Sequence, residues 1–112
     1  MKLLIVRYGR ERGHDDPEQA AALMQAAEKI AGVPGLVWKL WAYDDDQHIA
    51  TSIYLFDSES NARAWGDGPM VPALSARPGI SNIEVAYLDV DHDLSAATRA
   101  PLQAAQPVSL MA

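Results

Sequence analysis

The chain contains no cysteine, which excludes a disulfide scaffold, a thiolate metal site and a cysteine nucleophile. Basic residues are scarce: nine Lys and Arg stand against fifteen Asp and Glu, and the formal net charge is −6. Nucleic-acid binding needs a basic surface, so we expect no nucleic-acid partner. No apolar run approaches the ~20 residues of a membrane-spanning helix, and the first residues lack the features of a signal peptide. We therefore expect a cytoplasmic protein that does not bind membranes.

The most informative segment, residues 34–56, has the pattern of two apolar strands joined by an acidic turn at residues 44–47. Most hairpins alternate apolar and polar residues, because one face meets water. Here both faces are apolar, with Leu36, Trp38, Leu40 and Ala42 on one, Val37, Trp41 and Tyr43 on the other, and Lys39 as the only charge. A chain of 112 residues forms one domain, whose own helices can cover one side of such a sheet. We expect a second copy of the chain to cover the other.

The remaining segments complete the order strand, helix, strand, strand, helix, strand. Short apolar patterns predict strands at residues 2–8 and 82–90. Helical periodicity follows Pro17, with Asp15 or Asp16 as the cap, and stops at Gly32. A second helix is predicted at residues 59–65, and shorter ones at 70–76 and 94–99.

Right-handed crossovers fold this order into an α+β, ferredoxin-like domain, in which a four-stranded antiparallel sheet carries both main helices on one face. The helix-free face would be apolar and exposed, which soluble monomers rarely tolerate. We therefore predict a homodimer in which two sheets stack face to face. The domain is expected to span residues 1–102, with residues 103–112 as a mobile C-terminal tail.

Three segments carry a family resemblance. Pro34-Gly35 leads into Trp38-Lys39-x-Trp41, His48-x-Ala50 leads into Ile53-Tyr54-Leu55-Phe56, and the strand end Asp89-Val90 is followed by Leu94-Ser95. Together they resemble the YdhR-like mono-oxygenases, a branch of the dimeric α/β barrel superfamily, over roughly residues 1–102. The superfamily also includes heme-degrading enzymes, isomerases and cyclases, so the fold alone does not fix the reaction.

The resemblance implies a small mono-oxygenase that needs no cofactor and acts on an electron-rich aromatic substrate, phenolic or polyketide-like. Its pocket would lie between the sheet and the helices, and the substrate itself would supply the electrons. Two alternatives remain open: a non-oxidative isomerase or cyclase on the same scaffold, and a binding module without turnover. Oxygen consumption separates the first reading from the other two.

Asn61 and Trp65 lie four residues apart on the second main helix and share a face. They resemble an Asn–Trp pair of some quinone-forming oxygenases, in which the amide would bind a developing oxyanion and the indole would donate its N–H and exclude water. Otherwise Trp65 is core and Asn61 faces solvent. His48 occupies a family position and would act as a base near neutral pH, or it contacts only solvent and nearby Asp residues.

Trp38, Trp41 and Tyr54 are candidates for an aromatic substrate-binding wall, or they fill the core or the dimer interface. Trp38 and Trp41 differ in strand parity, so at most one of them faces the pocket. Lys39 lies on the Trp41 face and would act there as a base or an anion anchor, unless its side chain snorkels or pairs with the second subunit. The acidic run at residues 44–46 lacks the Gly and distal Glu of a calcium loop. The run at residues 89–93 alternates along a strand end, so its members do not converge, and we expect no metal site.

Overall fold

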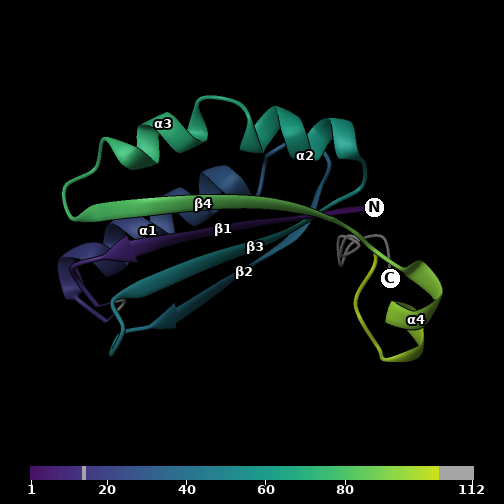
Figure 1. Ribbon diagram of the computed structural model, residues 1–112, viewed down its shortest axis with the longest axis horizontal. Helices are drawn as coiled ribbons and strands as arrows, with labels where there is room; N and C mark the ends of the chain where they lie inside the picture. The colour runs from purple at the N-terminus through teal and green to yellow at the C-terminus, as the bar shows by residue number, and fades with distance from the viewer. Residues whose placement is uncertain (14, 104–112) are drawn as a thin grey trace, which may run out of the picture.

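The computed structural model describes residues 1–13 and 15–103, and these form a four-stranded sheet with helices packed against it (Figure 1). The elements are β1 (Lys2–Arg10), α1 (Pro17–Ile30), β2 (Leu36–Asp44), β3 (Ile49–Phe56), α2 (Glu59–Gly66), α3 (Met70–Ser75), β4 (Ile80–Asp89) and α4 (His92–Ala97). The strand order is β2-β3-β1-β4 and every pair is antiparallel. The ferredoxin-like α+β class predicted from the sequence is confirmed. His14 and residues 104–112, which include most of the predicted tail, lie outside the described residues.

Side-chain caps set where the helices begin. The Asp16 carboxylate accepts a hydrogen bond from the backbone N–H of Glu18 at 3.0 Å, so α1 begins at the next residue, as predicted. The Asp91 carboxylate accepts from the backbone N–H of Leu94 at 2.9 Å. This cap starts α4 at His92, two residues earlier than predicted, because Asp91 satisfies a free N–H of the first turn. None of the described helices is long and apolar enough to cross a membrane.

The core lies between the sheet and three of the helices. Its buried members are Leu4, Val6 and Tyr8 of β1, Ala50, Tyr54 and Phe56 of β3, and Ala62 of α2. Ile30 of α1, Trp65 of α2, and Met70 and Leu74 of α3 pack against this cluster. Helices α1, α2 and α3 therefore cover the same face of the sheet.

The opposite, helix-free face of the sheet is apolar except at one end, where Arg7, Thr51 and Glu84 lie. It carries Leu3 and Ile5 of β1, Leu40 of β2, Ile53 of β3, and Ala86 and Leu88 of β4. Leu40 is 56% exposed and Leu88 is 49% exposed. At one edge the segment after α4 approaches β2, where the indole N–H of Trp38 donates to the carbonyl of Pro101 at 2.6 Å. The apolar face is thus exposed in the single chain.

A β-bulge at the start of β2 changes one sequence-based assignment. The register of β2 against β3 shifts between Leu36 and Trp38. Leu36, which simple alternation places on the Trp38 face, instead packs against the core, because the extra residue in the bulge reverses the side-chain direction. Beyond the bulge, Lys39 and Trp41 share a face, as predicted, and this face is the one turned toward the helices, which the sequence left open.

Candidate active site

A cavity of about 290 Å³ lies between the sheet and helices α1, α2 and α3; we call it the Lys39 cavity. The sheet contributes Val6, Tyr8, Lys39, Trp41, Ser52 and Tyr54. The helices contribute Leu23, Ala26, Ile30, Trp65, Met70, Ala73 and Leu74, and two basic residues, Lys29 and Arg77, complete the lining. The volume is close to the lower end of the ~300–1,000 Å³ typical of small-molecule sites. The cavity is therefore large enough for a small organic molecule.

Lys39 is the polar centre of this cavity. Its Nζ lies 3.2 Å from the centroid of the Trp41 ring and 4.8 Å from that of Tyr54. Burial lowers the pKa of Lys39 to about 7, because the apolar surroundings disfavour the charged form. Among the described residues Lys39 has no ion pair. A lysine in this setting can accept and return a proton at neutral pH.

Trp65 brings a hydrogen-bond donor to the same cavity. Its ring packs edge-on against Tyr54, with centroids 6.3 Å apart. Burial raises the pKa of the Tyr54 hydroxyl, and the nearby Trp65 N–H and Ser52 hydroxyl partly oppose this. The Trp65 N–H nevertheless lacks hydrogen-bond geometry to any acceptor in the described part of the chain, although it is buried. A buried donor without an acceptor costs about 1–3 kcal/mol, so an oxygen atom of a ligand would be favoured there.

Asn61 does not line the Lys39 cavity. Its side-chain amide donates to the Asp57 carboxylate at 2.8 Å, and its backbone N–H donates to the Ser58 hydroxyl at 3.1 Å. Residues four apart share a helix face but lie about 6 Å apart along the axis. Trp65 therefore reaches over the sheet while Asn61 stays at the first turn of α2, beside Gly35.

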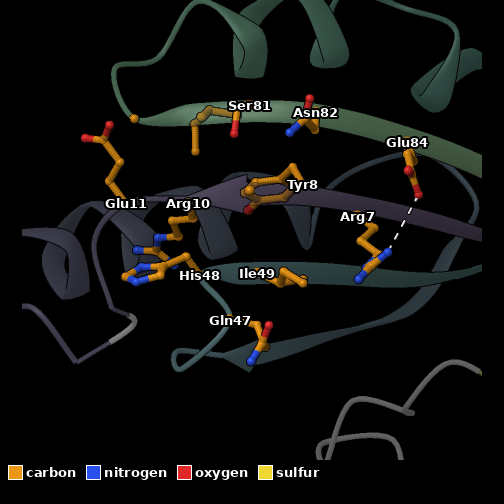
Figure 2. A pocket seen from close by; sticks show the side chains of 13 residues that line it. Arg7, Tyr8, Arg10, Glu11, Gln47, His48, Ile49, Ser81, Asn82 and Glu84 are labelled. Carbon is orange, nitrogen blue, oxygen red and sulfur yellow. Dashed lines mark ion pairs between the residues drawn. The ribbon is translucent and has the colours of Figure 1, made fainter.

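His48 lies in a different cavity, of about 840 Å³, which also exposes Arg7, Glu84 and Asn82 (Figure 2). The residue is exposed and follows the β2–β3 turn with a left-handed backbone, φ +56°. We place the candidate site in the smaller cavity, because the larger one is polar and holds no aromatic wall comparable to Trp41, Tyr54 and Trp65.

The structure thus brings together four of the seven candidates, Lys39, Trp41, Tyr54 and Trp65. It places His48, Asn61 and Trp38 elsewhere. Ser52 and Tyr8 were missed, although alternation from Tyr54 and Val6 points to both. Lys29 and Arg77 were also missed, because no local pattern connects the end of α1 with the turn before β4.

Metal and heme binding find little support in this lining. No group of three or more His, Asp or Glu side chains able to hold a metal occurs within residues 1–13 and 15–103. Neither described histidine, His48 nor His92, lines the Lys39 cavity. The lining therefore does not fit a heme iron held by an imidazole.

Solved structures with the same fold include several oxygenases. A mutant of MhuD, the heme degrader of Mycobacterium tuberculosis, with two manganese protoporphyrin IX bound is 17% identical, with a TM-score of 0.60 over 81% of this chain and 95% of that one. A mutant of SnoaB, a cofactor-independent oxygenase from Streptomyces nogalater, is 16% identical (TM-score 0.59; 80% and 92% covered). The ActVA-Orf6 mono-oxygenase of Streptomyces coelicolor, in complex with nanaomycin D, is 21% identical (TM-score 0.54; 78% and 84%).

At these sequence identities the solved structures establish the fold alone. The family is assigned from the match of the amino-acid sequence. No curated protein matches the chain. Residues 6–101 match the family described as "Putative mono-oxygenase ydhR". This match covers most of the 112 residues, and it agrees with the resemblance drawn from the hairpin. The chain therefore belongs to the ydhR mono-oxygenase family and is an enzyme of that type.

Proposed function

We propose that the protein oxidises a small, electron-rich phenol in the Lys39 cavity, using molecular oxygen and no cofactor. One observation carries the proposal. Lys39 is a primary amine held among aromatic rings, and burial lowers its pKa to about 7. The family match and the oxygenases of the same fold support this assignment.

The reaction begins with proton transfer. The neutral amine of Lys39 takes the phenolic proton and becomes an ammonium paired with the phenolate. The phenolate is electron-rich enough to reduce oxygen, and a bond forms between a ring carbon and one oxygen atom. The peroxide takes the proton back from Lys39. Loss of the ring C–H proton then breaks the O–O bond, which gives a quinone and water, so one oxygen atom enters the product.

The other cavity residues support these steps. The rings of Trp41 and Tyr54 would hold the flat substrate against the sheet. The unpartnered N–H of Trp65 would donate to the oxygen atom on which charge develops. Apolar side chains of α1 and α3 would keep water out, which strengthens both interactions. Asn61 and His48 do not line this cavity, so the proposed steps assign them no role.

We also propose that the enzyme is a homodimer that stacks the helix-free faces of two sheets, forming a dimeric α/β barrel. The support is the exposure of Leu40 and Leu88 at 56% and 49%, together with half-buried Leu3, Ile5 and Ile53 on the same face. An obligate interface of this kind buries on the order of 2,000 Å² or more.

The test is oxygen uptake by chelator-treated, dialysed protein with a panel of naphthols, naphthalenediols and anthrones. We expect uptake in proportion to enzyme concentration, with one O₂ consumed for each quinone formed, and loss of uptake in Lys39→Met. A base in an apolar pocket would also serve an isomerase or cyclase. Conversion of a panel compound under argon, with no uptake in air, would favour that alternative and contradict the proposal.

A further inference from the structure

Charge around the Lys39 cavity differs from that of the chain as a whole. Three basic residues, Lys29, Lys39 and Arg77, line it, and no Asp or Glu does. The chain has fifteen acidic and nine basic residues among 112, so a lining of this size would contain about two acidic residues by composition alone. Every Asp and Glu lies within the described residues. The cavity is therefore a positive site on a protein of net charge −6.

Two other cavities of this chain combine basic and acidic residues. The 840 Å³ cavity combines Arg7 and Arg10 with Glu11 and Glu84. A further cavity of about 290 Å³ beside it combines Arg10 and Arg12 with Asp15 and Asp45. In both, the basic side chains already have carboxylates close by. A cavity of about 220 Å³ that adjoins the Lys39 cavity also lacks carboxylates, but Lys39 is its one charged lining residue. The combination of several basic residues with no carboxylate therefore distinguishes the Lys39 cavity from these other three.

Three separate elements bring the basic residues together. Lys29 lies in the last turn of α1, Lys39 on β2, and Arg77 in the turn between α3 and β4. Lys29 and Arg77 are exposed, whereas Lys39 is half-buried, so the first two belong to the mouth and the third to the floor. Neither Lys29 nor Arg77 forms an ion pair with any described residue.

The backbone fixes the turn that carries Arg77. Its N–H donates to the carbonyl of Leu74 at 3.1 Å, and its carbonyl accepts from the N–H of Ile80 at 3.4 Å. Gly79 adopts φ +81°, a conformation that glycine reaches without strain. Arg77 is thus held at the mouth by a defined turn.

We infer that the substrate is an aromatic acid, with its ring on Trp41 and Tyr54 and its carboxylate between Lys29 and Arg77. This inference rests on the proposed function and narrows its substrate class. A guanidinium binds a carboxylate through two parallel hydrogen bonds, and a second cation opposite strengthens the attraction. The acidic surface elsewhere repels anions, so the mouth is the favoured point of entry. A hydroxyaryl carboxylate would place its phenol toward Lys39 and its acid group at the mouth.

A matched pair of ligands tests this without turnover. 6-Hydroxy-2-naphthoic acid and its primary carboxamide have the same rings, phenol and size, and differ in the charge of one group. We would measure both dissociation constants by tryptophan fluorescence under argon, at low and high salt. The acid should bind about tenfold more tightly than the amide at low salt. Salt should reduce this ratio, because it screens exposed charges.

Substitutions at the mouth test whether Lys29 and Arg77 cause the preference for the acid over the amide. In the double variant Lys29→Gln, Arg77→Gln the ratio should fall below about threefold, with the amide bound as in the wild type. Arg99→Gln, which removes an exposed positive charge outside the cavity, should leave the ratio unchanged. Both replaced mouth residues are exposed, and thermal unfolding of each variant checks that the fold is retained.

Equal binding of acid and amide by the wild type, or a ratio that survives in the double variant, would overturn the inference alone. Absence of binding by both ligands would overturn the inference, whereas the proposed function fails only if no phenol of the panel supports oxygen uptake. A preference for the acid without oxygen uptake from any phenol would support the inference and contradict the oxygenase chemistry. The two proposals therefore fail in distinguishable ways.

Discussion

The Nζ atom of Lys39 lies 3.2 Å from the centroid of the Trp41 ring, inside a cavity that contains no carboxylate. Two effects compete at this contact. Burial lowers the pKa from 10.5 to about 7, which corresponds to roughly 4–5 kcal/mol. A cation–π contact favours the ammonium by about 0.5–2 kcal/mol. Burial is the larger effect, so Lys39 can lose its proton near neutral pH.

The first prediction concerns the pH dependence of turnover. The proposed mechanism needs the neutral amine, whose fraction rises as pH passes through the pKa of about 7. For a phenol that is itself protonated, kcat/KM should rise about tenfold per pH unit below 7 and level off above it. Oxygen uptake between pH 5 and 9 measures the profile. A flat profile, or a rise centred near 10, would contradict the role of Lys39 as the base.

The second prediction is that Lys39→Met makes the fold more stable. Below pH 7 Lys39 is protonated in both the folded and unfolded states, and the folded state bears the full cost of the buried charge. Above pH 7 the unfolded state binds more protons, since its pKa is near 10.5, so the wild type gains stability as pH rises toward 10. We expect the free energy of unfolding of Lys39→Met at pH 6 to exceed that of the wild type by about 1–3 kcal/mol.

Urea unfolding at pH 6 and pH 9 checks this prediction. The advantage of Lys39→Met over the wild type should shrink at pH 9. If Lys39→Met is less stable than the wild type at pH 6, Lys39 stabilises the fold through packing or ion pairing. The interpretation of Lys39 as a buried base that destabilises the fold would then be wrong.

The alternation and capping signals predicted a large part of the fold, because both act over a few residues. Parity alone placed Lys39 and Trp41 on one face and Trp38 on the other. Parity failed at Leu36, because the bulge before Trp38 inserts one residue that no local pattern reveals. The helices and strands were thus predictable where patterns within a few residues determine them. They were not predictable where the pairing of one strand with its neighbour changes the side-chain direction.

The candidate site was less predictable than the fold. The sequence grouped Asn61 with Trp65 because they share a helix face. Asn61 lies one turn earlier, however, and its side-chain amide donates to Asp57. Lys29 and Arg77 line the same cavity from elements far apart in the chain, so their sequence neighbourhoods carry no signal. The roles proposed for Asn61 and His48 from the sequence remain predictions.

The third prediction distinguishes the contribution of the Trp65 ring to binding from the contribution of its N–H to turnover. Trp65→Phe keeps an aromatic wall and removes the donor, so turnover should fall about 10–100-fold with ligand binding changed less than about threefold. Trp65→Ala removes the wall and should weaken binding by about 1–3 kcal/mol. Asn61→Ala serves as a matched control on the same helix. If it slows turnover while Trp65→Phe does not, the donor is Asn61, as the sequence comparison predicted.

The fourth prediction concerns the helix-free face. Leu40→Glu combined with Leu88→Glu places charges at exposed positions of this face, and the proposed dimer should dissociate, because burying an unpaired carboxylate is costly. Met24→Glu, on α1 and 64% exposed, should have no effect. Light scattering at micromolar concentration should give twice the chain mass for the wild type and Met24→Glu. A monomeric, folded wild type would contradict the dimer.

The most direct measurement of the central claim is labelling with ¹⁸O₂. Chelator-treated protein would be incubated under ¹⁸O₂ with the phenol that gives the fastest uptake, and the quinone examined by mass spectrometry. The account predicts one ¹⁸O atom in the product, the other in water, and no labelled product with Lys39→Met. A product without ¹⁸O, or full activity of Lys39→Met, would contradict mono-oxygenation through Lys39.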